Sequence, residues 1–540
     1  MTLTDTATWK NLANLAAQLQ STHLAQALRA ATPAAAPALT AATLYCDFGK
    51  QNVTQETFAT LLNLADDAKL GEQRNSMFRG EPINSSEQRP ALHVALRGSG
   101  LDLPAAVTSA VSATRSRMEA IAGTISSGAW RGYTGRYITD IVHIGIGGSH
   151  LGPELAVQAL GQFAVTRQRV HFVANVDAYD LHQALHGLNP ETTLFIIVSK
   201  SWSTLETRVN ANTARCWFLE RSCDMSAIPK HFLAITTHTQ QAADFGLPEE
   251  NLLPMWDWVG GRYSIWSAVG LPLLITLGAR RFAEFLSGAQ AMDQHFLDAE
   301  PAENGPMLAA LFALWNTNFL GAGSHAVLAY DGRLEMLPDY LQQLEMESNG
   351  KSVTQDGQTV GHHTMPIVWG GAGTQGQHAY HQLLHQGTRA FSADFVLCAR
   401  TPYGLKEHQD WLGANALAQS QAMAEGFSPE ADEPHRAVAG NHASTTIVLP
   451  ELTPFTLGAL LAFYEHKTFC LGTLWRINPF DQWGVELGKK LALPIFDALK
   501  NDTRGDKTTD DNQTGGTTAN PQEFDISTRT LIEHIKSQQH

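Results

Sequence analysis

Short β-branched runs recur along this chain, and each is separated from the next by enough residues to form a helix. The first set of runs is Ile141–Gly145, Arg169–Ala174, Leu194–Ser199 and Phe232–Thr236. After a helical middle region comes a second set, Ala326–Tyr330, Met365–Trp369, Phe395–Ala399 and Thr446–Leu449. Strands that alternate with helices indicate βαβ units, in which helices cover both faces of a parallel sheet. The spacing therefore predicts an α/β protein with two αβα sandwiches in tandem, joined near Ile275 to Ala279.

The length of 540 residues agrees with this organisation, because one domain usually takes ~100–200 residues. We expect residues 1–110 to form a helical N-terminal region that packs on the large domain. Residues 111–276 should form the smaller sandwich, which includes the hydroxyl-rich loop described below, and residues 277–500 the larger one. Residues 501–540 should form a linker and a C-terminal helix, since Asn501–Asn520 is polar and Ile526–Ile535 has helix-like apolar spacing.

Charge and cysteine content exclude several classes of protein. A net charge of −15 argues against nucleic-acid binding, which needs a basic surface, although a few local cations can still bind a small anion. The five cysteines are scattered without a C-x-x-C pair, which favours reduced thiols over disulfides or a zinc site. We recognise no signal peptide and no apolar run of the ~20 residues needed to span a membrane. We therefore expect a soluble cytoplasmic protein.

Glycines follow the first predicted strand, in the segment IVHIGIGGSHLGP (Ile141–Pro153). The segment lacks the dinucleotide-binding pattern G-x-G-x-x-G, because His150 stands where the last glycine is required. It is not a Walker A loop either, since no Gly-Lys-Ser/Thr follows. The sequence therefore supports no nucleotide cofactor. The glycines serve either a structural turn or the close approach of backbone N–H groups to a ligand.

A second loop, after the run Leu194–Ser199, is rich in hydroxyl groups. Its polar residues are Ser199, Lys200, Ser201, Ser203 and Thr204, and a predicted helix follows. Hydroxyls, an ammonium group and a helix N-terminus together suit a phosphate dianion. The alternative is simple capping of the helix, for which one hydroxyl would suffice. We favour a phosphate site.

Two longer segments carry a resemblance to a known family. The first is TLWRINPFDQWGVELGK (Thr473–Lys489), in which a helix from Asp481 onward would place Gln482, Glu486 and Lys489 on one face. By itself this pattern is typical of an amphipathic helix with a solvated side. The second segment is DWVGGRYSIWSAVG, which begins at Asp257. Together they resemble the two sequence signatures of the phosphoglucose isomerase family, the glucose-6-phosphate isomerases, and the resemblance covers nearly the whole chain.

This resemblance implies two sugar isomerase (SIS) domains with mainly parallel sheets, N-terminal helices and a C-terminal arm. It implies reversible aldose–ketose interconversion of glucose 6-phosphate and fructose 6-phosphate, in glycolysis and gluconeogenesis. The reaction would pass through a cis-enediol with a glutamate as base, without a cofactor. No metal site is expected, because the sequence has no ligand set of convincing spacing. The resemblance also implies a homodimer with an active site shared between subunits.

Roles for individual residues follow from the same resemblance. The expected catalytic residues are Glu347, His378, Lys489 and Arg262. The expected substrate-binding residues are Gly148, Ser149, Ser199, Lys200, Ser201, Thr204, Gln343 and Gln482. Glu347 would move a proton between C1 and C2 of the open sugar, and Arg262 would face the enediolate oxygens. His378 would enter the site from the other subunit and open the sugar ring with Lys489.

Each assignment has a plainer alternative. Most glutamates are solvated surface charges, which is the alternative for Glu347. The alternative for Arg262 is a structural pair with Asp257, and two further histidines, His381 and His385, lie close to His378.

The chain also departs from the family pattern in several places. His150 replaces a usual Asp, and Ser201, Trp202 and Ser203 replace T-F-T in the phosphate loop. Gly371 stands where an acidic residue is commoner, and His442–Ala443 where the family has Arg-Pro.

Two other functions stay open on the sequence. A non-catalytic sugar-phosphate sensor would keep the phosphate loop but would be free to lose Glu347, Arg262 or His378, all of which are present. A related aminosugar or mannose 6-phosphate isomerase is the other; the amidotransferase type would need an N-terminal catalytic cysteine, and Cys46 lies too far into the chain. The preferred interpretation requires Glu347 and the loop ending at Thr204 to converge on one cleft.

Overall fold

The computed structural model describes residues 2–19, 23–29, 35–500 and 524–539. Contacts between residues divide the chain into two compact units, Met1–Phe480 and Asp481–His540. Both predicted sheets belong to the first unit. The finer division at residues 110, 276 and 500 stays a prediction.

The first sheet has five parallel strands in the order β4-β3-β5-β6-β7. Their bounds are β3 Asp140–Ile144, β4 Arg169–Val173, β5 Thr193–Val198, β6 Phe232–Ile235 and β7 Leu252–Leu253. The first four are the runs predicted from the sequence, whereas the two-residue strand β7 was not predicted. Because Ile144 pairs with Ile197 in parallel, the loops after β3 and β5 lie at the same edge of the sheet.

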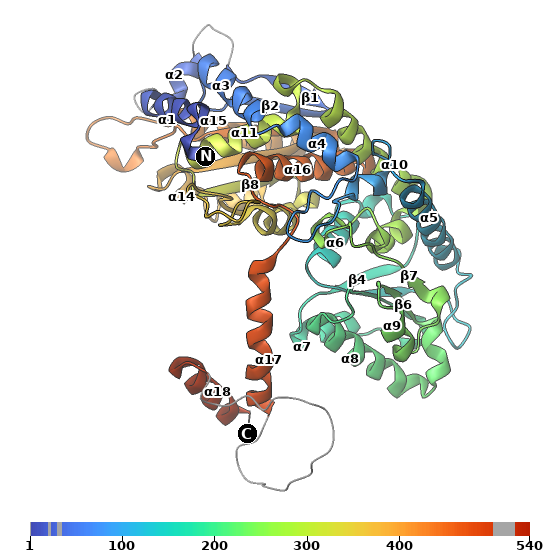
Figure 1. The fold of residues 1–540 in the computed structure, drawn as a ribbon. Coiled ribbons are helices and arrows are strands. Elements are labelled where there is room, and N and C mark those ends of the chain that lie inside the picture. The colour runs from blue at the N-terminus through green and yellow to red at the C-terminus, as the bar shows by residue number, and fades with distance from the viewer. Residues whose placement is uncertain (1, 20–22, 30–34, 501–523, 540) are drawn as a thin grey trace. The chain divides into compact units, whose positions relative to one another are not determined.

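Alternate residues of this sheet face two different cores, as a sandwich requires. Ile141 and Ile196 belong to the large core of the unit, and Val142 and Ile197 to a smaller one. The large core lies on the side of α5 (Ala105–Ser126), α6 (Leu151–Ala159) and α10 (Leu271–Asp298). The smaller core lies on the side of α7 (Ala178–Leu185), α8 (Leu205–Ser222) and α9 (Thr239–Phe245) (Figure 1).

The second sheet has six strands in the order β1-β2-β11-β10-β8-β9. Their bounds are β1 Ala38–Ala41, β2 Leu44–Lys50, β8 Ser324–Tyr330, β9 Ile367–Ala372, β10 Phe391–Arg400 and β11 Ser444–Glu451. Strands β11, β10, β8 and β9 run parallel to one another, and β2 joins β11 in the antiparallel sense. The four parallel strands overlap the second set of predicted runs.

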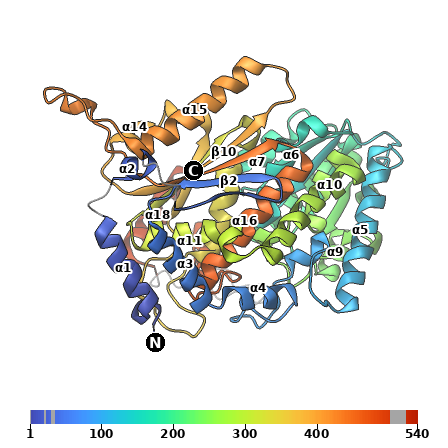
Figure 2. The same ribbon diagram turned by 90° about the horizontal axis from the view of Figure 1, so that it is seen from above.

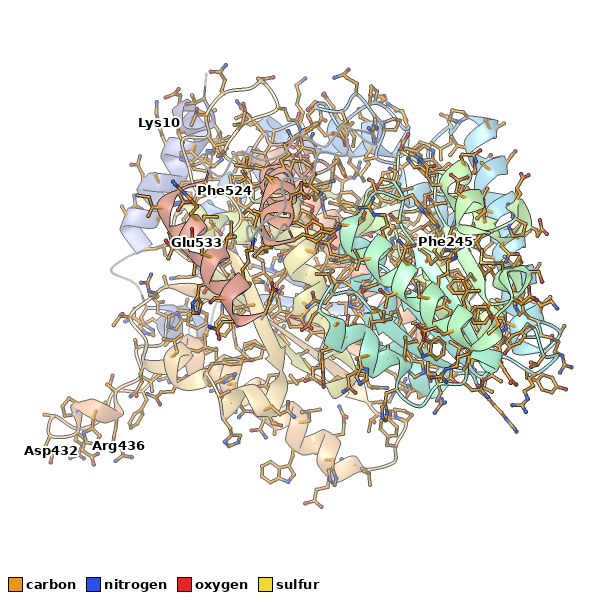
Figure 3. The ribbon with its side chains drawn as sticks, turned by 90° about the horizontal axis from the view of Figure 1, so that it is seen from below. Lys10, Phe245, Asp432, Arg436, Phe524 and Glu533 are labelled. Atoms are coloured by element: carbon orange, nitrogen blue, oxygen red, sulfur yellow. The ribbon has the colours of Figure 1, made fainter. Side chains whose placement is uncertain are left out.

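Helices cover both faces of the second sheet as well. Val396 faces the large core, which also contains residues of α11 (Gly305–Asn318) and α16 (Pro454–Leu474). Phe395 and Leu397 face a third core with α14 (His381–Gln386) and α15 (Lys406–Glu425). Figure 2 shows α15 on one side of β10 and α11 and α16 on the other. The loop between α15 and β11, which carries Asp432 and Arg436, projects from the rest of this region (Figure 3).

The N-terminal region is only partly helical, which corrects the prediction for the first hundred residues. It contains α1 (Ala7–Leu19), α2 (Leu24–Arg29), α3 (Gln55–Asp67) and α4 (Leu70–Phe78), but also the hairpin of β1 and β2. In β2 the buried residues Leu44, Cys46 and Phe48 alternate with more exposed ones. This period-two pattern is a strand signal that the surrounding Ala-rich sequence concealed.

Helix α10 spans the predicted junction between the two sandwiches. Gly278 has φ 72° and ψ 162° within it, so the helix is interrupted inside the predicted segment Ile275–Ala279. Beyond this point α10 packs against α16 in the large core. Two shorter helices of this unit, α12 (Leu337–Leu341) and α13 (Gly373–Gln377), lie in the chain on either side of β9.

The second unit contains α17 (Glu486–Lys500) and α18 (Ile526–Gln538), and Lys536 Nζ donates a hydrogen bond to the Ala498 carbonyl at 3.2 Å. Helix α18 confirms the predicted C-terminal helix. Helix α17 begins at Glu486, after a 3₁₀ turn at Trp483–Val485, and Gln482 has a non-helical φ of −151°. The expectation of a helix from Asp481 is therefore wrong, and Gln482 does not share a continuous helix with Lys489.

The predicted linker Asn501–Asn520 lies outside the described residues. Among the helices of the described ranges, none has the length and apolar character that crossing a membrane requires.

Candidate active site

The glycine loop after β3 is held against two other segments of the first unit. A Cβ atom added to Gly148 would lie 2.0 Å from the Gly261 carbonyl carbon and 2.5 Å from the Arg262 backbone nitrogen. One added to Gly147 would lie 2.8 Å from Gln343 Nε2. Gly147 also has a φ of 58°, which favours glycine. Glycine is therefore required here because the loop, the backbone before Arg262 and the Gln343 side chain approach one another closely.

Further hydrogen bonds fix this loop. His143, the fourth residue of β3, donates from Nε2 to the Ser149 carbonyl at 2.6 Å, and Ser264 Oγ donates to the Gly148 carbonyl at 3.3 Å. Burial lowers the pKa of His143 to about 4, and its bond to the Ser149 carbonyl only partly opposes that shift. His150, the residue that departs from the family pattern, forms an ion pair with Glu154 at 2.9 Å when protonated.

The candidate catalytic pair Arg262 and Glu347 lies beside this loop. Arg262 is 4% exposed, and its Nη1 lies 3.6 Å from Glu347 Oε2. The Glu347 side chain keeps 22% of its surface exposed, so the carboxylate is partly open to solvent. A cation fixed beside a partly open carboxylate can stabilise negative charge that develops on a bound molecule.

The remaining donors of Arg262 hold it in place. Its Nε donates to Ser348 Oγ at 2.6 Å and its Nη2 to the Pro479 carbonyl at 2.7 Å. Tyr263 OH lies 3.1 Å from the same Ser348 oxygen. The alternative partner Asp257 does not contact Arg262; it pairs instead with Lys200 at 3.2 Å and Arg89 at 3.9 Å.

Glu347 ends a π-helical turn, Gln342–Glu347, which interrupts the helix that α12 begins. π-Helical turns are rare in proteins, and those that occur are often found at functional sites. Lys351 Nζ donates to the carbonyls of Glu347 at 3.0 Å and Ser348 at 2.7 Å, so the segment after the turn is held as well. The sequence pattern did not identify Ser348, Tyr263 or Lys351, although Ser348 and Lys351 belong to the S-N-G-K string that follows Glu347.

The hydroxyl-rich loop follows β5 at the same sheet edge as the glycine loop. Ser199 is buried and Ser201 is exposed. Thr204 is the N-cap residue of the eighteen-residue helix α8, yet its side chain makes no capping hydrogen bond. Ser199 Oγ lies 3.5 Å from Thr204 Oγ1, and Ser203 Oγ donates to Ser201 Oγ at 2.8 Å. Simple capping therefore does not account for these hydroxyls.

His378 is exposed at the end of α13, and its side chain makes no hydrogen bond or ion pair with another described residue. The two alternative histidines both contact Gln419 of α15. His381 Nδ1 lies 3.1 Å from Gln419 Oε1, and His385 Nε2 lies 2.7 Å from the same atom. Of the three histidines, His378 is thus the one open to contact with a second molecule.

Gln482 and Lys489 belong to the second compact unit. Lys489 Nζ pairs with Glu486 Oε1 at 2.8 Å on α17. The structure therefore brings Gly148, Ser149, Arg262, Gln343 and Glu347 together, and it places the loop Ser199–Thr204 at the neighbouring strand end. The convergence of Glu347 and Thr204 on one cleft stays a prediction, as do the roles of Gln482 and Lys489.

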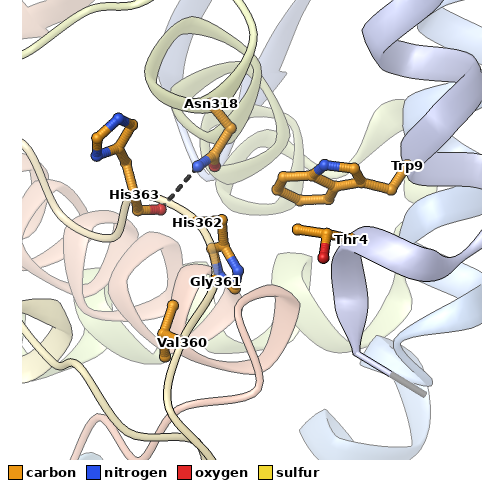
Figure 4. A pocket seen from close by; sticks show the side chains of 7 residues that line it. All are labelled: Thr4, Trp9, Asn318, Val360, Gly361, His362 and His363. Atoms are coloured by element: carbon orange, nitrogen blue, oxygen red, sulfur yellow. Dashed lines mark hydrogen bonds between the residues drawn. The ribbon is translucent and has the colours of Figure 1, made fainter.

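One cavity of the first unit lies apart from these residues. It has a volume of about 430 Å³ and is lined by Thr4, Trp9, Asn318, Val360, Gly361, His362 and His363 (Figure 4). None of the predicted site residues lines it. Within the described ranges, no group of three or more His, Cys, Asp or Glu side chains is arranged to hold a metal ion.

Comparisons with known proteins agree with this architecture. The family model for phosphoglucose isomerase matches residues 47–531. A glucose-6-phosphate isomerase from Shewanella frigidimarina (strain NCIMB 400) is 45% identical over 524 residues, which cover 93% of this chain and 96% of that protein. One from Hahella chejuensis (strain KCTC 2396) is 47% identical over 486 residues, which cover 85% of this chain and 86% of that protein.

Among solved structures, that of a glucose-6-phosphate isomerase from Chlamydia trachomatis D/UW-3/Cx matches with a TM-score of 0.83 and 31% identity. The match covers 93% of this chain and 98% of that chain. The two mainly parallel sheets, each covered by helices, define an α/β protein, and the solved isomerase shares this fold along nearly its whole length. The chain belongs to the phosphoglucose isomerase family, because that family's model matches most of its length.

Proposed function

We propose that this chain catalyses the reversible isomerisation of glucose 6-phosphate and fructose 6-phosphate, and so acts in glycolysis and gluconeogenesis. The observation that carries the proposal is the pair of Arg262 and Glu347, 3.6 Å apart beside the glycine loop. An aldose–ketose isomerase needs a base at the carbon that loses its proton and a fixed cation for the oxyanion that forms. Relatives with this name match along most of the chain.

In the forward reaction the Glu347 carboxylate takes the proton from C2 of the open aldose. The C–H electrons form the C1–C2 double bond, and the carbonyl electrons move to O1, so a cis-enediolate results. Arg262 stabilises that negative charge because it is buried and oriented before the reaction begins. Glu347 then returns the proton to C1 while the O2 proton is transferred to O1, which yields the ketose.

The phosphate group is proposed to bind in the loop after β5. Ser199, Lys200, Ser201 and Thr204 supply hydroxyls and an ammonium group at the N-terminus of α8. Gly148, Ser149 and Gln343 are proposed to line the sugar, since the glycine loop and Gln343 lie in contact.

Ring opening is assigned to His378 with Lys489, and Gln482 is assigned a substrate contact. We propose that His378 enters the site of a second subunit in a homodimer. Its side chain is exposed and makes no hydrogen bond or ion pair with another residue of the described ranges, which supports that arrangement. An imidazole suits the task because its unperturbed pKa of ~6.5 lets it exchange protons near neutral pH.

We also propose a cytoplasmic location. All five cysteines are free, and Cys46, Cys398 and Cys470 are buried. Free thiols are usual in a reducing compartment.

A coupled assay that converts fructose 6-phosphate to glucose 6-phosphate tests the proposed activity. Run in D₂O, the reaction should place solvent deuterium at C2 of glucose 6-phosphate, because the base exchanges its proton with solvent. Absence of turnover with a folded protein would favour the non-catalytic sugar-phosphate sensor, and turnover without deuterium would contradict the proton-transfer mechanism.

Mixing two inactive variants tests the shared active site. If Glu347→Gln and His378→Gln subunits exchange at random, about a quarter of the sites receive both intact residues. Activity should then recover to about that fraction. If each site takes both residues from one chain, mixing restores nothing.

A further inference from the structure

The π-helical turn Gln342–Glu347 presents its side chains to two opposite environments. Gln343 contacts the glycine loop and Glu347 contacts Arg262, so these two face the candidate site. Glu345 stands between them in sequence but is fully buried, with 0% exposure. Residues two apart in a helical turn project to nearly opposite sides, so whatever holds Glu345 also sets the direction of Glu347.

Glu345 is held by an ion pair with a residue remote in sequence. Lys467 Nζ of α16 lies 2.9 Å from Glu345 Oε1, and the Lys467 side chain is 2% exposed. Burial alone would lower the pKa of Lys467, but Glu345 and Asp394 outweigh burial and raise it. Lys467 is therefore a charged group in the core of the protein.

A second layer of contacts fixes Lys467 itself. Asp394 Oδ2 of β10 lies 3.7 Å from Lys467 Nζ, accepts a hydrogen bond from Tyr464 OH at 3.1 Å and lies 3.1 Å from His325 Nε2 of β8. His325 Nδ1 in turn lies 2.8 Å from Ser392 Oγ. The anchor of Glu345 thus rests on two central strands and one helix.

Burial of this ion pair needs a reason other than stability. Two buried charges lose their hydration, and replacing such a pair by apolar residues of similar volume is often neutral or stabilising. A buried pair does specify a unique arrangement, because sliding the turn by one residue would move the Glu345 carboxylate away from Lys467 and leave it buried without a cation. The other end of the turn has a similar anchor, since Asn349 Nδ2 donates to the Thr468 carbonyl of the same helix at 3.0 Å.

We propose that the Glu345–Lys467 ion pair is a positioning device that sets the rotation of the π-helical turn and so aims the Glu347 carboxylate at the reacting carbon. Neither residue touches substrate. The proposal rests on the proposed isomerase function, because it explains how the base of that reaction is oriented. It predicts that removing the pair lowers kcat without changing the fold or the affinity for substrate.

The central experiment uses the double variant Glu345→Leu with Lys467→Met, which replaces both charges of the pair by apolar groups and leaves Asp394 with His325 and Tyr464 as its partners. We expect the unfolding midpoint in urea to stay near that of the wild type, and KM for fructose 6-phosphate to stay within about twofold. We expect kcat to fall about 10- to 100-fold, since a misplacement of about 1 Å can cost that much. A folded double variant with wild-type kcat would overturn the proposal.

A second variant keeps the test decisive if the double variant does not fold. Glu345→Asp retains the charge but shortens the side chain by one methylene, so the ion pair would pull the turn toward α16. The expected result is a lowered kcat with unchanged KM, and Lys467→Arg, which keeps the charge and adds reach, should partly restore kcat in that background. Wild-type kcat in Glu345→Asp would also overturn the proposal.

A matched control separates this effect from the general loss of an ion pair. Asp331 and Arg333, at the end of β8, pair at 2.6 Å with side chains 10% and 13% exposed. Asp331→Asn with Arg333→Met should leave kcat unchanged, and an equal loss of kcat there would contradict a specific role for Glu345. Turnover of the wild type in the same assay reports on the proposed function by itself, so the two hypotheses fail separately.

Discussion

The two ends of the candidate site are built in opposite ways. At the reaction end, Arg262 is buried and bonded to Glu347, Ser348 and the Pro479 carbonyl, which come from distant parts of the chain. At the proposed phosphate end, Lys200, Ser201, Ser203 and Thr204 are more exposed, and the hydroxyl contacts Ser199–Thr204 and Ser203–Ser201 lie within the loop itself. The difference matches two different tasks. Stabilising a charge that develops during the reaction requires dipoles and charges that are fixed in advance. A phosphate dianion can be bound by hydroxyl and ammonium groups that adjust locally.

This comparison predicts whether a substitution changes kcat or KM. Changes at the reaction end should lower kcat, because they remove interactions made in the transition state. Changes at the proposed phosphate end should mainly raise KM, because the group that we propose to bind there does not react.

The largest effect is expected for Glu347→Gln. Glutamine keeps the shape of the side chain but cannot accept the proton, so kcat should fall about 1,000-fold with little change in KM. The coupled assay measures both parameters, and urea unfolding checks the fold. Glu335→Gln, at an exposed glutamate shortly before α12, is the matched control and should leave kcat unchanged. Retained turnover in folded Glu347→Gln would reject the assignment of the base.

The next largest effect is expected for Arg262→Lys. Lysine keeps one positive charge but cannot bond Glu347, Ser348 and Pro479 at once, so the cation would no longer be held in one orientation. We expect kcat to fall about 100-fold, as for removal of one oxyanion donor. Arg280→Lys, at an exposed arginine on α10, should have no effect. If Arg262→Lys changes KM alone, the reaction end does not depend on fixed charge as the comparison requires.

A smaller effect is expected at the phosphate end, for Lys200→Met. Loss of one charge-assisted contact with the phosphate should raise KM for fructose 6-phosphate about tenfold and leave kcat nearly unchanged. The exposed partner Asp257 loses an ion pair that contributes little to stability. The corresponding change at Lys10, an exposed lysine of α1, should alter neither parameter. A fall in kcat with constant KM would show that this loop takes part in the chemistry.

Much of the fold followed from local patterns in the sequence, and the exceptions have physical causes. Eight predicted runs overlap strands because parallel strands buried on both faces read as continuous apolar segments. The hairpin of β1 and β2 was missed because its alternation covers few residues inside an Ala-rich region. The helix predicted from Asp481 starts later, at Glu486, since helix boundaries depend on local backbone geometry that apolar spacing does not encode.

The candidate site divides in the same way. The glycine loop and the hydroxyl-rich loop were found from residue type and spacing, because each is continuous in sequence. The partners of Arg262 were not found: Ser348 and Pro479 meet it only through tertiary packing. The π-helical turn at Glu347 was not predicted either, because the apolar spacing of so short a segment does not distinguish a π-helical turn from an α-helical one.

The last and smallest effect concerns the pH dependence of stability at the reaction end, where His143 supports the glycine loop. Burial lowers the pKa of His143 to about 4, so the folded protein holds this imidazole neutral while the unfolded chain protonates it near ~6.5. The unfolded state then binds more protons, and the free energy of unfolding must fall as pH drops below 6.5, by about 1.4 kcal/mol per pH unit for this residue.

His143→Gln can still donate a hydrogen bond to the Ser149 carbonyl but does not titrate. Between pH 7.5 and 5.0 the wild type should therefore lose about 2 kcal/mol more stability than the variant in urea unfolding experiments. Other buried histidines cancel in this difference because both proteins contain them. A difference that stays constant with pH would mean that the folded protein does not hold His143 neutral.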